Sequence, residues 1–389
     1  MKSPVPLNTP VRSLYVQVPF CPERCDYCSI PVSVRPDRAD GYVRALSIEK
    51  ERIRSRIDLR TLETLYLGGG TPTVLEPSLF SDLIDCLADG LSPLKEVTTE
   101  SRPDTLTLPI LKMLEQKGVT RLSIGMETAS PVQMDFLGRS SGSYDIVRFI
   151  DSVRNVFSGQ ISMDFIIGGT GYDPKQFRTV AGTLLEAGLD HLSVYPLTFE
   201  ERTVLSLRDS RGEVPGETGD EAAEAWRKTT SDLRSMGWYQ YEVANFSRNQ
   251  ETVCLHNRNV WEGNSYLGMG AGAHQRINSV RNENVRSHKT YESILGRRER
   301  PSVFQENLSE EELFLEILYT NARLSYGFPK EWLDVRIDPY DLSRFLVHMI
   351  ENRWVCEKDL QKNRVIFTPE GWVWLDHLIG ELSGLIGDR

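Results

Sequence analysis

The fold is decided by the stretch LYVQVPFCPERCDYC at residues 14–28, in which an apolar run typical of a strand leads directly into three closely spaced cysteines. Cys21, Cys25 and Cys28 are four and then three positions apart, so one loop can bring all three thiols around a small inorganic group. Cysteine thiolates are soft ligands that select zinc, copper(I) or iron–sulfur clusters. The spacing favours a 4Fe–4S cluster with one iron left open for another ligand.

Two other interpretations of these cysteines stay open. A structural zinc site needs four protein ligands, and residues 29–31 contain neither Cys nor His, so zinc would require a distant ligand. A disulfide with one spare thiol is the third interpretation. The remaining cysteines are scattered along the chain at Cys86, Cys254 and Cys356, which fits a reducing compartment better than a disulfide framework.

The chain has 389 residues and a formal net charge of −10. This length suggests about two or three domains. No stretch reaches the roughly 18 consecutive apolar residues of a spanning helix, so we expect a cytoplasmic protein without an integral membrane segment. We expect no nucleic-acid partner, because the acidic chain lacks the basic stripe that contacts with phosphates require.

From residue 13 to about residue 200, short β-rich runs alternate with amphipathic segments. This alternation is typical of parallel strands joined by crossover helices. It predicts an α/β fold, a partial (β/α)6 barrel, with strands at residues 13–19, 64–68, 96–100, 120–124, 161–166 and 191–197.

In a βα barrel, the loops at the carboxyl ends of the strands carry the functional groups. The cysteines follow the first strand, and the run Gly68-Gly69-Gly70-Thr71 follows the second, where glycines let the backbone approach a ligand closely. Glu100 and Glu127 stand at the ends of the third and fourth strands. Asp164 lies inside the fifth strand, where a carboxylate in an apolar run requires a partner. We therefore expect these groups to face one site.

Three domains are predicted: the barrel at residues 1–200, an α+β extension at 201–300 and a winged-helix-like domain at 301–389. We expect a strand at 239–246 and a β-hairpin at 354–367. Gly268, Gly270 and Gly272 have the spacing GxGxG, which differs from the dinucleotide fingerprint GxGxxG, so close packing of the chain is the better explanation for them.

Cys254, His256 and His274 are possible metal ligands that lie close together in the extension. Haem iron is commonly held by His or by a Cys thiolate. The alternative is a buried histidine that is hydrogen-bonded to its neighbours and has a purely structural role. Both interpretations stay open at this point.

Together these residues resemble the radical SAM enzymes, and within them the branch of coproporphyrinogen III dehydrogenase and its HemW-type haem-chaperone relatives. The resemblance runs from Leu14 to His274 and is weaker in the C-terminal part. The motifs that carry it are LYVQVPFCPERCDYC, YLGGGTPT, RLSIGMETAS, HLSVYPLTFE, YQYEVANFS, CLHNRNVW and YLGMGAGAH.

The resemblance implies two cofactors, a 4Fe–4S cluster and S-adenosylmethionine (SAM), which is cleaved to a 5′-deoxyadenosyl radical. The implied cluster ligands are Cys21, Cys25 and Cys28. The implied SAM contacts are Gly69, Gly70 and Thr71 at the methionine end, Glu100 at the amine or ribose, Arg139 at the carboxylate and Asp164 at the ribose hydroxyls.

Within the branch, the sequence favours the chaperone side. The dehydrogenases usually carry a long N-terminal arm and a fourth cysteine two residues after the third, whereas here 20 residues precede Cys21 and Ile30 stands at the extra position. The run HNRNVW at residues 256–261 is similar to the chaperones' HNxxYW motif, with Val260 in place of Tyr. The resemblance thus implies haem as cargo, contact with haem at His256, and an apo-haemoprotein as client.

The alternative function is that of an oxygen-independent coproporphyrinogen III dehydrogenase, which decarboxylates a porphyrinogen oxidatively and in which Tyr15 would be catalytic. The chain departs from the pattern of the branch at Gln17, where His is usual, and at Arg102, Glu127 and Pro196. These departures bear on the substrate and leave the cluster ligands intact. Radical SAM modification of tRNA is disfavoured by the acidic balance of the chain.

Overall fold

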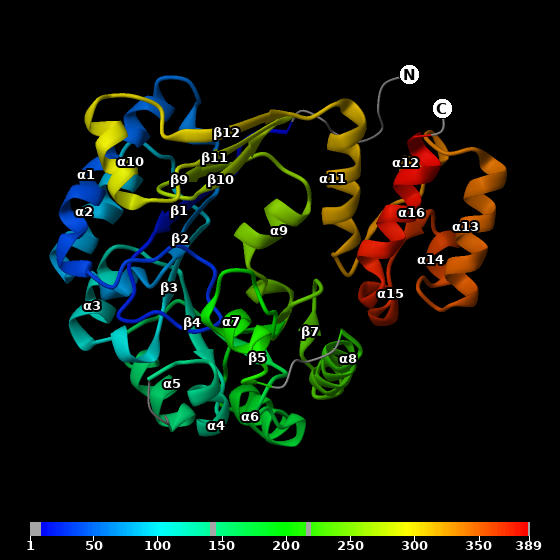
Figure 1. Cartoon of the computed structure of the whole chain (residues 1–389), viewed down its shortest axis with the longest axis horizontal. Coiled ribbons are helices and arrows are strands. Elements are labelled where there is room, and N and C mark those ends of the chain that lie inside the picture. The colour runs from blue at the N-terminus through cyan, green and yellow to red at the C-terminus, as the bar shows by residue number, and fades with distance from the viewer. Residues whose placement is uncertain (1–8, 141–144, 215–218, 388–389) are drawn as a thin grey trace.

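The computed structural model describes residues 9–140, 145–214 and 219–387. Within these residues twelve strands form one sheet, covered by helices (Figure 1). The six central strands are parallel: β1 (Ser13–Val18), β2 (Thr64–Gly69), β3 (Glu96–Ser101), β4 (Arg121–Glu127), β5 (Gln160–Ile167) and β6 (His191–Pro196). The helices between them are α1 (Ala39–Arg54), α2 (Pro77–Ala88), α3 (Leu108–Gln116), α4 (Pro131–Phe136), α5 (Ile146–Arg154) and α6 (Pro174–Glu186). The predicted partial barrel of six βα units is confirmed.

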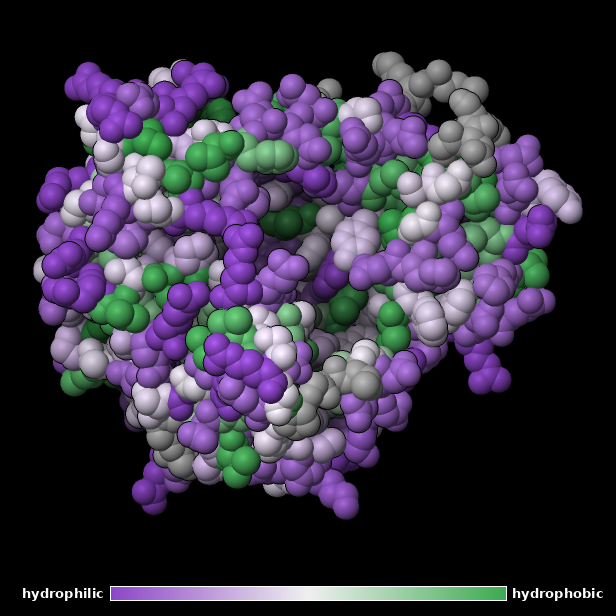
Figure 2. Space-filling model, in the orientation of Figure 1, coloured by the Kyte–Doolittle hydropathy of each residue, from purple (hydrophilic) through white to green (hydrophobic). Residues whose placement is uncertain are grey.

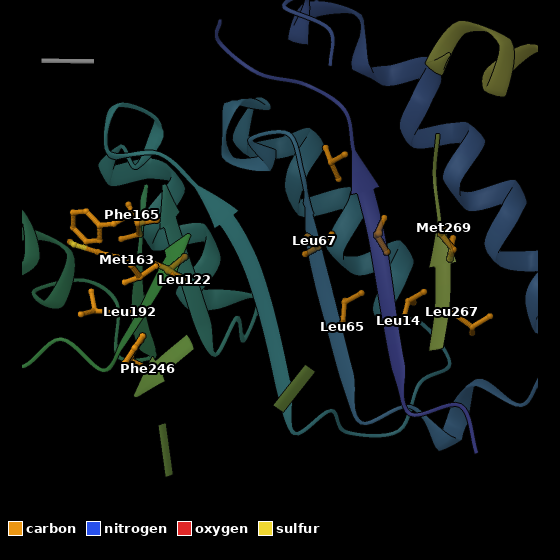
Figure 3. Packing of buried hydrophobic residues seen from close by; sticks show 14 of the residues in the cluster. Leu14, Leu65, Leu67, Leu122, Met163, Phe165, Leu192, Phe246, Leu267 and Met269 are labelled. Atoms are coloured by element: carbon orange, nitrogen blue, oxygen red, sulfur yellow. The ribbon is translucent and has the colours of Figure 1, made fainter. Parts of the chain in front are cut away.

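Side chains on the central strands alternate between two faces, as the period of two in a β-strand requires. One face is apolar and forms the main core, which includes Leu14, Leu65, Leu67, Leu122, Met163 and Phe165 (Figure 3). The other face carries Tyr15, Tyr66, Glu100, Asp164 and Tyr195, which line cavities instead. The alternation in the sequence therefore places these polar and aromatic side chains together on the face of the sheet opposite the main core.

The extension contributes strands to both edges of the barrel sheet. After α7 (Val204–Ser210) and α8 (Gly219–Ser235), the short strands β7 (Tyr239–Gln240) and β8 (Asn245–Ser247) follow, and β8 pairs antiparallel with β6. The predicted single strand at 239–246 is therefore wrong: the chain reverses there, and the Glu242 carboxylate accepts the N–H of Ala244 at 2.9 Å inside the turn.

At the opposite edge, α9 (Leu255–Trp261) leads into β9 (Tyr266–Met269), which pairs parallel with β1. The antiparallel strands β10 (His274–Ile277), β11 (Val280–Asn284) and β12 (Ser302–Asn307) complete the sheet, and α10 (His288–Gly296) lies between β11 and β12 in the chain. A Cβ atom on Gly268 would lie 2.0 Å from the His274 carbonyl oxygen, and one on Gly270 would lie 2.5 Å from that of Gln17. Close packing of the chain is thus confirmed at Gly268 and Gly270.

The C-terminal part is mainly helical and lies to one side of the sheet (Figure 1). It contains α11 (Glu310–Ala322), β13 (Phe328–Pro329), α12 (Glu331–Asp334), α13 (Pro339–Glu351), α14 (Glu357–Gln361), β14 (Arg364–Val365), α15 (Pro369–Val373) and α16 (Leu375–Gly387). The hairpin predicted at 354–367 is wrong in its middle, where α14 lies and from which β14 pairs with β13, but its ends meet in an antiparallel bridge between Val355 and Phe367. No helix among the described residues has the length and apolar character needed to cross a membrane. The domain boundaries remain predictions.

Candidate functional site

The cysteine loop follows β1 at the carboxyl end of the parallel strands. Its three thiols are half-buried and face one cavity of about 410 Å³. The loop is bonded to the neighbouring glycine run, because Thr71 N–H donates to the Phe20 carbonyl at 2.7 Å and the Thr71 hydroxyl lies 3.6 Å from Cys21 Sγ. The first two strands therefore present the cysteines and glycines side by side, as the sequence predicts.

Two acidic side chains fix the loop from opposite sides. Glu23 accepts a hydrogen bond from the buried guanidinium of Arg102 at 2.7 Å, and Asp26 forms an ion pair with Arg208 of α7 at 3.0 Å. Beneath the loop, Tyr27 packs on a small apolar cluster that is separate from the main core. These contacts hold the backbone of the loop in place.

Burial keeps the three thiols protonated in the cluster-free protein. Burial raises the pKa of all three cysteines, and it raises that of Cys25 to about 11 although the Arg139 charge opposes the change. Free thiols would be protonated at neutral pH, so binding of iron must release their protons. In the parts of the chain that the structure describes, no three His, Cys, Asp or Glu side chains are arranged to hold a single metal ion.

The glycine run forms one wall of the same cavity. Gly69 has a φ of +93°, and a Cβ atom there would lie 2.2 Å from the Gln17 side chain. A Cβ on Gly70 would lie 2.5 Å from the Phe20 carbonyl oxygen. Side chains are thus excluded at both positions, because the neighbouring strand β1 and the residues after it pack against these glycines, and both glycines also line the cavity.

Two carboxylates stand on the strands that form the floor of this cavity. Glu100 accepts the N–H of Gly69 at 2.7 Å, and burial together with the charge of Asp164 raises the pKa of Glu100 to about 7. Asp164 accepts the Ser123 hydroxyl at 2.8 Å through Oδ2, and burial raises its pKa. Its Oδ1 atom is buried and has no hydrogen-bond partner among the described residues, so a ligand that carries donors would satisfy it.

Arg139 lies on the wall of this cavity and is held by the chain itself. Its guanidinium pairs with Glu127 at 2.6 Å and donates to the Gly125 carbonyl. Burial acts to lower the pKa of Arg139, but the charge and hydrogen bond of Glu127 together with the charges of Tyr27 and Cys25 outweigh it and raise that pKa. Arg139, which the resemblance implies as the contact of the SAM carboxylate, therefore already contacts a carboxylate of the protein.

The set of residues fits the cofactors that the resemblance implies. Three convergent thiols, a backbone wall of glycines and the unpartnered Oδ1 of Asp164 suit a cluster with an adenosyl ligand beside it. When bound, the cluster supplies the electron that cleaves SAM. The chain would hold the cluster through its three thiols and would offer the carboxylates of Glu100 and Asp164 to the ligand's hydroxyl and amine groups.

A second and larger cavity of about 1650 Å³ adjoins the first, and the two share Tyr66, Glu100 and Tyr195 as wall residues. Figure 2 shows a hollow in this face of the molecule, near the position of α9 in Figure 1. Tyr15 lines the larger cavity, stacks on Tyr66 with ring centroids 5.9 Å apart and donates to Gln17 Oε1 at 2.8 Å.

His256 also lines the larger cavity, next to these tyrosines. Its ring lies 5.0 Å from that of Tyr66, and Thr64 Oγ1 contacts its Nδ1 at 2.8 Å. Burial lowers the pKa of His256 to about 3, so the imidazole is neutral at physiological pH. The contact with Thr64 fits the tautomer protonated at Nδ1, in which Nε2 keeps its lone pair for a ligand.

Sequence reasoning missed the two residues that position His256. One is Thr64, and the other is Glu96, whose carboxylate accepts the backbone N–H groups of Leu255 at 2.8 Å and His256 at 2.9 Å. Glu96 therefore caps the start of α9, where a negative charge is favourable. A carboxylate at the start of a largely buried strand was a usable signal for Glu96. A threonine at the start of a strand gave no such signal for Thr64.

The other two candidate ligands near His256 do not join it. Cys254 is buried and contacts Glu96 Oε1 at 3.5 Å, and burial raises the pKa of its thiol to about 12. His274 is 61% exposed and lies 3.8 Å from Glu283 at the rim of the larger cavity. Only His256 combines burial with access to the larger cavity.

Comparisons with known proteins agree with this geometry. Residues 15–184 match the model of the radical SAM superfamily. The chain is 31% identical to the heme chaperone HemW of Bacillus subtilis over 96% of its own length and 97% of that protein, and 31% identical to the HemW of Mycobacterium tuberculosis over 81% and 82%.

Among solved structures, coproporphyrinogen III oxidase (HemN) from Escherichia coli, a radical SAM enzyme, superimposes with a TM-score of 0.80 at 20% identity. The superposition covers 97% of this chain and 91% of that one, so the two proteins share a fold. The chain belongs to the radical SAM superfamily and, within it, to the family of the HemW heme chaperones.

Proposed function

We propose that this protein is a haem chaperone that binds haem in the larger cavity and delivers it to an apo-haemoprotein. In this proposal Cys21, Cys25 and Cys28 hold a 4Fe–4S cluster, and SAM binds beside it in the smaller cavity. The names of the HemW relatives support haem as the cargo. The observation that carries the proposal is the environment of His256.

His256 has three properties that a haem ligand needs. Its Nδ1 is fixed by Thr64, its pKa of about 3 keeps the ring neutral, and the ring lies on the wall of a cavity. A metal-binding histidine is usually oriented by a hydrogen bond from its second nitrogen. A neutral imidazole in this orientation is a ready ligand for iron.

The larger cavity has the size and lining for a flat macrocycle. Its volume of about 1650 Å³ exceeds the roughly 300–1,000 Å³ of common ligand pockets. Tyr15 and Tyr66 give it aromatic walls beside His256. Trp261, which ends the helix that carries His256, adds a third aromatic side chain to the lining. Such walls favour contact with a planar conjugated ring.

We further propose SAM contacts for the residues that line the smaller cavity. Gly69, Gly70 and Thr71 would lie along the methionine end, Glu100 would accept from the amine or ribose, and Asp164 would accept from the ribose hydroxyls. The unpartnered Oδ1 of Asp164 supports the last assignment. Arg139 would serve the carboxylate.

Haem titration tests the cargo role. We expect the wild-type protein to give a saturable Soret shift and His256→Ala to lose it. His274→Ala is the matched control, because His274 stands on the rim of the same cavity but is mostly exposed. A wild-type protein without a saturable shift, or equal binding by His256→Ala, would contradict the proposal.

The second candidate function is oxidative decarboxylation of coproporphyrinogen III. It is favoured by the shared walls of the two cavities, which would place a substrate in the larger one beside the SAM site, with Tyr15 on the wall of the larger cavity. Anaerobic incubation with reductant, SAM and coproporphyrinogen III tests it. Formation of 5′-deoxyadenosine together with protoporphyrinogen would support catalysis, and absence of both would leave carriage as the function.

A further inference from the structure

The ion pair between Glu127 and Arg139 is the feature of the smaller cavity that SAM binding does not explain. Glu127 Oε1 lies 2.6 Å from the Arg139 guanidinium. The side chains are 15% and 2% exposed, respectively, and both residues line the cavity that holds the three cysteines. A buried pair of this kind is short, charge-assisted and little screened by solvent.

The local backbone is distorted to make this pair. The register between β4 and β5 is irregular from Gly125 to Glu127, and Glu127 has a φ of +62°, in the left-handed region. A bulge at the end of a strand turns a side chain in a new direction. Strained backbone of this sort persists where the surrounding structure enforces it, often at a functional site. Here it directs a carboxylate to Arg139.

A second buried arginine of the cavity wall, Arg102, is paired in the same way. Arg102 donates to Glu23 at 2.7 Å and to Asp104 at 2.9 Å. These two cations of the cavity wall thus contact carboxylates of the chain, whereas the buried Arg121 on the same wall donates to Gln160 and to the Thr252 carbonyl, and its Nη2 has no hydrogen-bond partner among the described residues. A ligand carboxylate that binds Arg139 must replace Glu127 there or share the guanidinium with it, and either route weakens the ligand's own interaction.

We infer that Glu127 occupies the place of a ligand carboxylate on Arg139 and thereby sets the affinity and selectivity of the smaller cavity for the amino-acid end of its ligand. This inference rests on the proposed binding of SAM in that cavity. Glu127 is a specificity-determining residue in this scheme: its carboxylate lowers the contribution of the SAM carboxylate to binding. The adenosyl end is held by other residues and is unaffected.

Glu127→Gln tests the inference in protein that carries its cluster. The amide keeps the shape and one hydrogen bond to Arg139 but loses the charge. Equilibrium dialysis would measure the affinity for SAM and for decarboxylated SAM, which lacks the carboxylate, after iron and sulfide analysis has shown equal cluster content. We expect SAM to bind about tenfold more tightly to the variant, the difference between a charge-assisted and a neutral hydrogen bond, and decarboxylated SAM to bind equally.

Glu200→Gln is the matched control, because it removes one negative charge from the wall of the same cavity. If both variants tighten SAM equally, the effect is long-range electrostatics and the inference is overturned. Unchanged or weaker SAM binding by Glu127→Gln also overturns it, while SAM binding itself stands. If neither wild type nor variant binds SAM, both proposals fall. If Glu127→Gln does not fold, Glu127→Asp replaces it, because its shorter side chain moves the carboxylate away from Arg139. This variant must then bind SAM more tightly than the wild type, by a smaller factor, and bind decarboxylated SAM equally.

Discussion

Replacing Thr64 with valine tests whether the protein positions His256 for a ligand. Valine has nearly the shape of threonine but cannot form a hydrogen bond, so the change removes the 2.8 Å contact with Nδ1 and keeps the packing. Thr64 is 0% exposed, so water cannot take the place of the hydroxyl. The imidazole would keep its place at the cavity and lose the partner that fixes its tautomer.

The size of the effect follows from this geometry. A buried imidazole N–H without a partner costs about 1–3 kcal/mol in the free energy of unfolding. Loss of the hydrogen bond that orients a metal-ligating histidine usually lowers metal affinity by about 10- to 100-fold. We therefore expect Thr64→Val to bind haem about 10- to 100-fold more weakly and to unfold at a lower urea concentration.

Thr98→Val is the matched control. Thr98 is also 0% exposed and lies on the adjacent strand β3, but its hydroxyl has no hydrogen-bond partner among the described residues. Its replacement should leave haem affinity unchanged and stability equal or higher. Soret titration and urea unfolding of both variants provide the measurements. Wild-type haem affinity in Thr64→Val, or equal losses in the two variants, would refute the reasoning.

Three further predictions concern other parts of the same region. Glu96→Gln should cost about 1–2 kcal/mol in the free energy of unfolding, because the charged acceptor for the start of α9 is lost, and weaker haem binding should accompany it in the Soret assay. Glu100→Gln should stabilise the cluster-free protein more at pH 8 than at pH 5. The pKa of Glu100 is about 7 in the folded protein, which is above its value in the unfolded chain. The wild type therefore loses stability as the pH rises from that unfolded value to about 7. If this reasoning is wrong, urea unfolding will show the same difference in stability between wild type and variant at both pH values. Gly270→Ala should destabilise the protein by about 3 kcal/mol, since φ is +97° and the new Cβ would lie 2.5 Å from atoms of Gln17 and Tyr42. Gly380→Ala in α16, which has open space around it, should instead stabilise the protein by up to about 1 kcal/mol. Thermal unfolding of both variants provides the measurement.

The barrel could be predicted from the sequence because its signals are local. Each parallel strand is a short β-rich run with a helix after it, and the alternation of apolar and polar residues fixes which face is buried. The strands at 239–247 are too short to give such a signal, and a buried glutamate, Glu242, reverses the chain between them. In the C-terminal part, the run Glu357–Gln361 forms a helix, and its favourable helix residues outweigh the hairpin pattern around it.

The cysteines, the glycine run, Glu100 and Asp164 could be placed at one site because each belongs to a strand of the same parallel sheet. The residues that position His256 could not, because the relevant contacts join segments far apart in the chain. Thr64 is 192 positions from His256, and a threonine at the start of a strand is ordinary. The Glu127–Arg139 pair was missed for a different reason: a bulge in β4 redirects the carboxylate, and regular strand geometry does not foresee it.

The contact of His256 and the glycine wall of the cluster cavity lie at opposite ends of one strand, although the larger cavity reaches both. Thr64, the contact of His256, begins β2, and Gly69, on the wall of the cluster cavity, ends it. At 3.3 Å per residue these positions are about 16 Å apart, with Tyr66 between them. A ligand on His256 is thus separated from the cluster end by the length of a strand, while both cavities share Tyr66 and Glu100. In the proposed scheme, haem carriage would depend on the start of β2 and SAM binding on its end, and the two would be coupled through the shared wall residues Tyr66 and Glu100.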